Sequence, residues 1–298
     1  MSDRALERGL KQVGTLGSGN HFLEIGRVDE IYLPEIANSL GVFTDQIVVL
    51  IHTGSRGLGY QTCEDFLKVM NQAMAKYNIQ LPDRQLACTP IGSPEGQDYL
   101  GAMAAAANYA WVNRQVIMSL AEKAFLKALN TNPAELGFSL IYDVCHNIAK
   151  IEDHMVDGKR RRVCVHRKGA TRAFPPGHAQ IPEAYQATGQ PILIPGDMGR
   201  YSYLLVGTEA AMEKTFGSTC HGAGRVMSRT QSKKQSQSID IDREMARRGV
   251  VARYQGRGTM AEEMPHAYKD VADVVETMDL AGISRKVARF RPVGVIKG

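Results

Sequence analysis

The sequence predicts an α+β fold in which the 298 residues form one compact mixed domain. Two observations predict this class. Short apolar runs typical of strands occur between longer segments typical of helices, and no internal repeat or Pro/Ser-rich linker divides the chain. Hydrophobic residues make up 44% of the chain and charged residues 22%, so a chain of this length can bury a core without disulfides.

The elements of the first half follow from local pattern. The continuous apolar run 46–52 (QIVVLIH) predicts a buried strand, and residues 61–79 predict a helix. The alanine-rich stretch 97–129 predicts a long helix that ends at 130–133 (NTNP), because proline cannot continue a helix. Residues 138–144 (FSLIYDV) predict a further strand.

The second half repeats this alternation of short apolar runs and polar helices. The expected strands and helices are 161–166, 191–195 and 201–207 (strands), 209–216, 229–248 and 267–280 (helices), and a closing strand over 286–298.

Charge and cysteine content bound the function class. The net charge of +5 favours an anionic partner, and part of the excess is local: the run Lys159–Arg162 is followed by Arg167, Lys168 and Arg172. The run itself predicts a solvated hairpin rim. Lys168 differs from the run because it lies in a turn-like HRKGAT, where we expect it to face phosphate. His154 and His178 are expected to be solvated surface residues.

Five cysteines without paired spacing exclude a disulfide framework and a zinc ribbon, and are typical of a reducing compartment. The first residues lack the apolar stretch of a signal peptide, and no window approaches the ~18 apolar residues of a membrane span. The expected localisation is therefore cytoplasmic.

Three Gly/Ser-rich segments each contain a histidine: 17–24 (GSGNHFLE), 52–59 (HTGSRGLG) and 218–225 (STCHGAGR). Glycine allows backbone to approach phosphate closely, arginine pairs with phosphate oxygens, and neutral histidine serves as metal ligand or nucleophile. The pattern predicts a polyphosphate- and metal-using site. For GSGNHFLE the alternative is a glycine-rich turn beside a core histidine. For His52, and for His146 in DVCHN, the alternative is a buried histidine without a catalytic or metal-binding role.

His221 is the sharpest candidate, because Gly222 and Gly224 leave its imidazole open. Arg225 and Arg229 are four residues apart, so on a helix they would share one face. This arrangement suits attack of an imidazole nitrogen on phosphorus, with guanidinium groups stabilising the developing charge and lowering the pKa of the histidine.

The chain resembles the RtcB family of RNA-splicing ligases over nearly its whole length. The resemblance runs from GTLGSGNHFLEI to PVGVIKG and includes, in order, HTGSRGLG, DVCHNIAK, HRKGATRAFPPG, PGDMGRYSYLLVGT, STCHGAGRVMSR and AYKDV. It implies a ligase that joins RNA 3′-phosphate or 2′,3′-cyclic phosphate ends to 5′-hydroxyl ends, in RNA repair or tRNA splicing, using GTP and two Mn²⁺ ions.

The resemblance also assigns residues. It implies that His221 becomes guanylylated and that His21, His52 and His146 bind manganese. The remaining assignments are Asn20, Arg56, Lys168, Arg225 and Arg229 for RNA or GTP phosphates, and Glu24, Phe22, Ser202, Tyr268 and Lys297 for the guanosine. A glutamate can accept the N1 and N2 hydrogens of guanine, a donor pair that adenine lacks.

One family feature is absent. Members contain, upstream of the GNH segment, an Asp and a Cys that complete the manganese site, whereas this sequence starts a few residues before GTLGSGNH. We therefore expect a truncated form, or one part of a split ligase whose partner polypeptide supplies that segment. The alternatives are a GTP- or RNA-binding remnant without catalysis, and a manganese-dependent phosphodiesterase that needs His52 and His146 but not His221.

Overall fold

The computed structural model describes residues 1–83 and 85–298 and divides into two compact units. Unit 1 comprises Met1–Gly17 and Thr53–Phe138, and unit 2 comprises Ser18–His52 and Ser139–Gly298. Helices dominate the first unit and an antiparallel sheet dominates the second, so the α+β prediction is confirmed. That residues 1–298 act as one catalytic domain stays a prediction.

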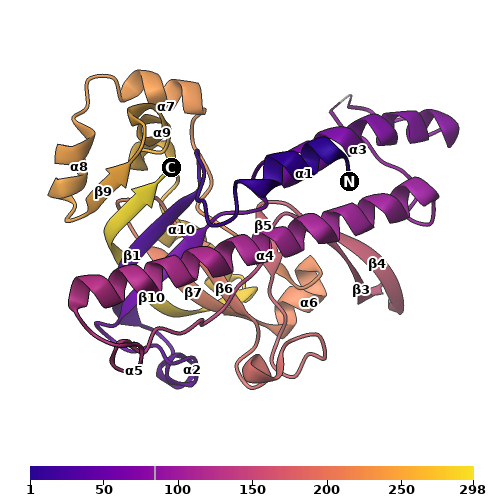
Figure 1. Ribbon diagram of the computed structural model, residues 1–298. Helices are drawn as coiled ribbons and strands as arrows, with labels where there is room; N and C mark the ends of the chain where they lie inside the picture. The colour runs from indigo at the N-terminus through magenta and orange to yellow at the C-terminus, as the bar shows by residue number, and fades with distance from the viewer. Residues whose placement is uncertain (84) are drawn as a thin grey trace. The chain divides into compact units, whose positions relative to one another are not determined.

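Unit 1 is built from three substantial helices and one short one. They are α1 (Asp3–Leu10), α3 (Arg56–Lys76), α4 (Pro94–Leu129) and α5 (Pro133–Leu136), and α3 packs against both α1 and α4 (Figure 1). At the start of α4 the Ser93 hydroxyl accepts a hydrogen bond from Gly96 N at 3.1 Å. The helix ends where Asn130 adopts a left-handed conformation with φ 50°, so the predicted long helix and its terminator are confirmed.

A buried asparagine on α4 holds two loops of unit 1. The Asn113 side chain is fully buried, and its oxygen accepts from Gly14 N at 2.7 Å and Thr15 N at 3.1 Å. Its amide nitrogen donates to Thr15 O at 3.1 Å and Gly54 O at 3.2 Å. These bonds satisfy backbone groups of both segments that lead into the first two glycine-rich motifs.

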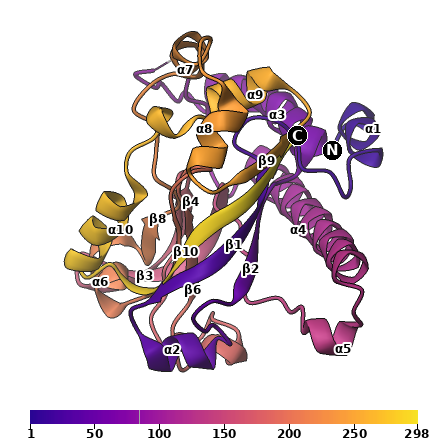
Figure 2. The same cartoon turned by 90° about the vertical axis from the view of Figure 1, so that its left-hand side faces the viewer.

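Unit 2 contains a six-stranded sheet in the order β2-β1-β10-β7-β6, with β9 pairing β10 in parallel and every other pair antiparallel (Figures 1 and 2). Its strands are β1 (Phe22–Ile31), β2 (Ile47–His52), β6 (Pro191–Pro195), β7 (Ser202–Gly207), β9 (Val251–Tyr254) and β10 (Ser284–Lys297).

Two smaller antiparallel sheets and several short helices complete unit 2. The small sheets pair β3 (Ile148–Val156) with β4 (Lys159–Arg167), and β5 (Ala170–Arg172) with β8 (Ser218–Cys220). The helices are α2 (Pro34–Ser39), α6 (Glu209–Thr215), α7 (Arg229–Gln235), α8 (Ile241–Arg247), α9 (Arg257–Glu262) and α10 (Val271–Leu280), with 3₁₀ turns η1 (Glu183–Tyr185) and η2 (Pro265–Ala267).

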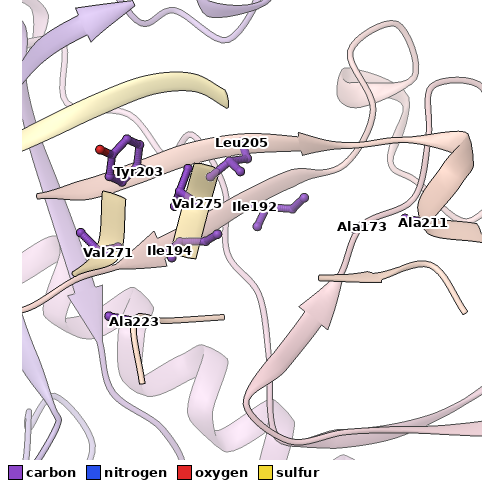
Figure 3. Close-up of a cluster of buried hydrophobic side chains, with 9 residues drawn as sticks. All are labelled: Ala173, Ile192, Ile194, Tyr203, Leu205, Ala211, Ala223, Val271 and Val275. Carbon is purple, nitrogen blue, oxygen red and sulfur yellow. The ribbon is translucent and has the colours of Figure 1, made fainter. Parts of the chain in front are cut away.

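One hydrophobic core cluster of unit 2 lies where α10 packs on β6 and β7. Figure 3 shows Val271 and Val275 of α10 beside Ile192 and Ile194 of β6 and Leu205 of β7, and all five are fully buried. β7 is buried along its entire length. Its continuous apolar run YLLV is typical of such a strand, whereas a half-exposed strand would alternate apolar and polar residues.

Three predictions about elements are wrong. Residues 138–144 form no strand. Ile141 packs against the core, but its backbone carbonyl accepts a hydrogen bond from the Tyr185 hydroxyl and not from the backbone of a neighbouring strand. The helix expected over 229–248 is two helices, interrupted where the Asp240 side chain accepts from Arg243 N and caps α8. The strand predicted at 46–52 was expected to be buried, but β2 is an edge strand and is only half-buried.

Two further observations concern the chain as described. No helix among residues 1–83 and 85–298 is long and apolar enough to cross a membrane. No disulfide forms among the five cysteines, all of which lie in those ranges.

The core of unit 2 gives a stability prediction. Leu205→Ala removes a fully buried side chain from β7 and is expected to lower the free energy of unfolding by about 2–5 kcal/mol, because a cavity remains. Leu280→Ala is the matched control, since Leu280 is 78% exposed, and should change it by less than about 0.5 kcal/mol. Denaturant unfolding measures both, and equal effects would contradict the assigned core.

Candidate functional site

A cavity of about 270 Å³ in unit 2 brings together residues from segments far apart in the sequence. Its walls come from β1 and β10, from the loops that follow β6 and β8, and from α7. Of the residues singled out from sequence, the cavity is lined by Asn20, Phe22, Glu24, His52, His221, Arg225, Arg229, Tyr268 and Lys297.

Three imidazoles gather at one end of this site. His52 ends β2, His146 precedes β3, and His221 follows β8. The Nε2 atom of His52 lies 3.2 Å from Nε2 of His146 and 3.4 Å from Nε2 of His221. The rings of His146 and His221 stack with centroids 3.4 Å apart. One ring nitrogen from each lies within 4.8 Å of the others, so together they could hold a metal ion.

The backbone fixes the tautomer of His52. Its Nδ1 lies 3.0 Å from the carbonyl oxygen of Asn20, which can only accept, so Nδ1 carries the proton and donates. Nε2 then presents its lone pair toward the other two imidazoles, as in metal-binding histidines oriented by a second hydrogen bond. His21 lies farther out, with its ring centroid 6.2 Å from that of His52.

His221 is held by the small sheet beneath it. Ala170 of β5 pairs with Cys220 of β8, and the next backbone amide, that of His221, donates to the Gly169 carbonyl at 3.3 Å. Its Nδ1 is buried and makes no hydrogen bond to any described residue. Burial, followed by the neighbouring imidazoles of His146 and His52, lowers the pKa of His221 to about 2. The expected direction is confirmed, but its cause is not the arginines.

The opposite wall contains a buried carboxylate and a buried amine. Glu24 is 3% exposed on β1, and the Ser202 hydroxyl of β7 donates to it at 2.9 Å. Burial raises the pKa of Glu24 to about 7, against the effect of the Ser202 hydrogen bond. Burial likewise lowers the pKa of Lys297 on β10 to about 8. The Lys297 amine lies 5.8 Å from the ring centroid of Phe22.

The two arginines after His221 converge on one acid rather than on a helix face. Arg225 precedes α7, and Arg229 is its first residue, so the expected shared helix face is wrong. Both guanidinium groups instead approach Glu263, at 3.2 Å from Arg225 and 3.4 Å from Arg229. Tyr268 donates to the other oxygen of Glu263, and burial is the main cause that raises the pKa of this tyrosine.

Sequence reasoning missed Glu263 and Asp197, which also line the cavity. Glu263 is 2% exposed, and burial is the main cause that raises the pKa of Asp197. Asp197 lies in the segment PGDM and Glu263 in AEEM. No spacing rule joins Glu263 to arginines more than thirty positions away, so only the tertiary structure identifies it.

Two expected phosphate ligands lie outside the cavity wall. Lys168 is exposed and adjoins Gly169, which does line the cavity. Arg56 belongs to unit 1, where its Nε donates to Thr15 at 3.2 Å and burial lowers its pKa. A Cβ on Gly17 would clash with the Arg56 guanidinium, so Gly17 makes room for this group.

A second buried cluster lies on the inner face of the β3–β4 hairpin. Arg167 donates to both oxygens of Glu152 at 2.8 Å, and His154 lies 3.1 Å from the same carboxylate. All three residues are 2–3% exposed, so the prediction that His154 is a solvated surface residue is wrong. Arg167 also donates to the Ser218 hydroxyl at 2.9 Å, which links β4 to the strand that precedes His221.

Comparisons with known proteins show which family the whole chain is similar to. The model of the family described as tRNA-splicing ligase RtcB matches residues 1–298. A tRNA-splicing ligase RtcB of Archaeoglobus fulgidus is 54% identical over 298 residues, which are 100% of this chain and 62% of that protein. One from Methanococcus maripaludis gives the same values. One from Pyrococcus abyssi is also 54% identical over the whole chain, which covers 32% of its length.

The Glu152–Arg167 pair gives a test of how unit 2 is held. Glu152→Gln leaves the Arg167 charge buried without its counter-charge and is expected to cost about 3–5 kcal/mol of unfolding free energy. Asp153→Asn, at the next position, removes an exposed pair with Arg160 and should cost at most about 1 kcal/mol.

The pH dependence of this pair has a definite sign. Burial acts to raise the pKa of Glu152, but the hydrogen bonds from Arg167 and His154 outweigh it and leave the pKa below its ordinary value. The stabilisation is therefore present above the unfolded-state pKa and is lost as the pH falls through the lower folded-state pKa. Denaturant unfolding at a series of acidic pH values should show a shallower loss in Glu152→Gln than in the parent; parallel curves would contradict it.

Proposed function

The chain belongs to the RtcB family of tRNA-splicing ligases, and from this premise we propose that it ligates RNA. The proposed reaction joins a 3′-phosphate or 2′,3′-cyclic phosphate end to a 5′-hydroxyl end and uses GTP and Mn²⁺. Because the chain spans 62% or less of the length of these relatives, its activity, substrates and partners are all part of the proposal. The observation that supports this proposal most strongly is that His221, whose pKa is lowered, and the buried Glu24 line one cavity.

Glu24 would recognise guanine. Its carboxylate offers two acceptors to the N1 and N2 hydrogens, and Ser202 occupies only part of one of them. Lys297 and Tyr268 line the same cavity and would contact the remaining polar edges of the nucleoside, with Phe22 against its apolar surface. Since adenine presents no equivalent pair of donors, this wall would favour GTP over ATP.

His221 would act as the nucleophile. Its low pKa keeps the imidazole neutral near pH 7, so a ring nitrogen has a lone pair with which to attack the α-phosphorus of GTP. The P–O bond to pyrophosphate breaks as the P–N bond forms, leaving guanylyl-His221. The RNA 3′-phosphate then takes the guanylyl group, and the 5′-hydroxyl displaces GMP from the activated end.

The imidazole end fits a divalent transition metal. His52 points its Nε2 lone pair toward the cluster, and Nδ1 of His221 is buried without a partner among the described residues. We propose that His52 and His146 hold manganese, together with His21. Such an ion supplies charge neutralisation for the triphosphate and the leaving group.

The arginines would position phosphate. Glu263 holds Arg225 and Arg229 within hydrogen-bond reach of one carboxylate, which orders both guanidinium groups before a phosphate arrives. Asn20, Arg56 and Lys168 are proposed as further phosphate ligands.

Labelling tests the nucleophile. Incubation with GTP labelled on the α-phosphate and Mn²⁺ should leave an acid-labile label on the protein, because a phosphoramidate is stable to base and labile to acid. The label should fall to background in His221→Ala and after chelation of the metal. His178→Ala is the control, since His178 packs against Phe174 and does not line the cavity, and should keep the label. GTP binding without any label in the parent protein would instead favour a non-catalytic nucleotide-binding role.

Glu24 gives a pH prediction. Guanine needs the carboxylate form, so GTP affinity should rise as the pH rises through about 7. Glu24→Gln should bind GTP at least ~10-fold more weakly, because a charged hydrogen bond is worth about 1.5–3 kcal/mol, and should lose this dependence. Glu30→Gln, on the exposed part of β1, should behave as the parent. Calorimetric titration at constant Mn²⁺ measures all three, and an affinity independent of pH in the parent would exclude this role.

A further inference from the structure

The β3–β4 hairpin has two faces of opposite character. The strands pair without a break from Ile148↔Arg167 to Val156↔Lys159, and Asp157 and Gly158 form the turn with φ of 51° and 72°. Glu152, His154 and Arg167 share the inner face and are buried. The side chains of alternate positions, among them Met155 and Arg162, are exposed on the outer face.

The exposed end of this hairpin is strongly basic, with Lys159 and Arg161 on the face of Glu152 and with Arg160 and Arg162 on the outer face. The ten residues Lys159–Lys168 contain six lysines and arginines and no acid, and only Arg167 among the six is buried. On the outer face Asp153 is the acid available, and it pairs with Arg160 at 2.9 Å. Within residues 1–83 and 85–298, Lys159, Arg161 and Arg162 form no ion pair. Their positive charge is therefore available to an anionic partner.

The basic strand leads directly to the cavity. β4 ends at Arg167, whose bonds to Glu152 and Ser218 fix its position. The exposed Lys168 follows, and then comes Gly169, which lines the cavity and accepts from the backbone of His221. A strand of nine residues spans ~30 Å at about 3.3 Å per residue, so the cations extend well away from the reacting centre.

We infer that the exposed end of the β3–β4 hairpin, Lys159–Arg162, binds the sugar–phosphate backbone of the RNA strand, several nucleotides from the end that enters the cavity. This inference rests on the proposed function and adds a docking surface to it. RNA backbone fits better than an acidic protein, because the strand that carries these cations leads through Lys168 to Gly169, at a cavity suited to phosphate chemistry. The contact would be independent of base sequence, since the charges face phosphates.

The test compares RNA of two lengths bound to a hairpin variant. Lys159→Ala/Arg162→Ala removes two exposed cations, and Arg243→Ala/Arg247→Ala on α8 removes the same charge from another exposed surface. Fluorescence anisotropy measures the affinity for 3′-phosphorylated RNA of about four and about fifteen nucleotides, lengths that bracket common single-strand site sizes.

The hairpin variant should bind the long RNA about tenfold more weakly at ~0.1 M salt, and the slope of log affinity against log salt should fall by about 1.4. The short RNA should bind unchanged, and the α8 control should match the parent with both. Unchanged binding of the long RNA, equal loss with both lengths, or equal loss in the control would each overturn the inference.

Two readouts separate this inference from the proposed function. The α-phosphate label on His221 is measured on the same proteins and should be unaffected by the hairpin substitutions. A parent protein that takes no label counts against the proposed ligase activity. The comparison of the two RNA lengths alone decides whether the hairpin binds RNA. Polyglutamate binding that falls as much as RNA binding would indicate an acidic protein partner and would overturn the assignment to RNA.

Discussion

The pairing of β10 with three other strands is the interaction on which the cavity depends. β10 bonds antiparallel to β1 and β7 and parallel to β9. The register Glu24↔Val295 places the Glu24 side of the cavity beside β10, the strand that contains Lys297. The register Phe290↔Ser202 brings Ser202, the hydroxyl partner of Glu24, to the same sheet. A slip of one residue in β10 would turn its side chains to the opposite face and dismantle this wall.

The cavity is built from groups that burial disfavours in their charged forms. Desolvation shifts the pKa of Glu24 upward and the pKa values of His221 and Lys297 downward, each toward neutrality. The pairing of β1 with β10 positions Glu24 and Lys297, and Arg167 links β4 to the strand that precedes His221. Perturbed pKa values concentrated in one cavity are typical of a functional site.

Local pattern was enough to find the elements that are strongly periodic or sharply terminated. The long helix ending at Asn130 and the strands 191–195 and 201–207 lie where the sequence predicts them. The strand predicted at 138–144 failed because an apolar run says nothing of whether its backbone has a partner. The histidines and Glu24 were identified from their motifs, whereas Glu263 and the burial of His154 depend on contacts between distant segments that composition does not encode.

The pairing of β1 with β10 also has a consequence for how the protein is made. Leu23 and Ile296 lie opposite each other although 296 − 23 = 273 positions separate them. A ribosome therefore completes β1 long before its neighbour exists, and closing so large a loop makes this pairing slow. Until then β1 has only the edge strand β2 beside it, and its apolar face is open to aggregation. Nascent chains should therefore rely on chaperones until the last strand has emerged.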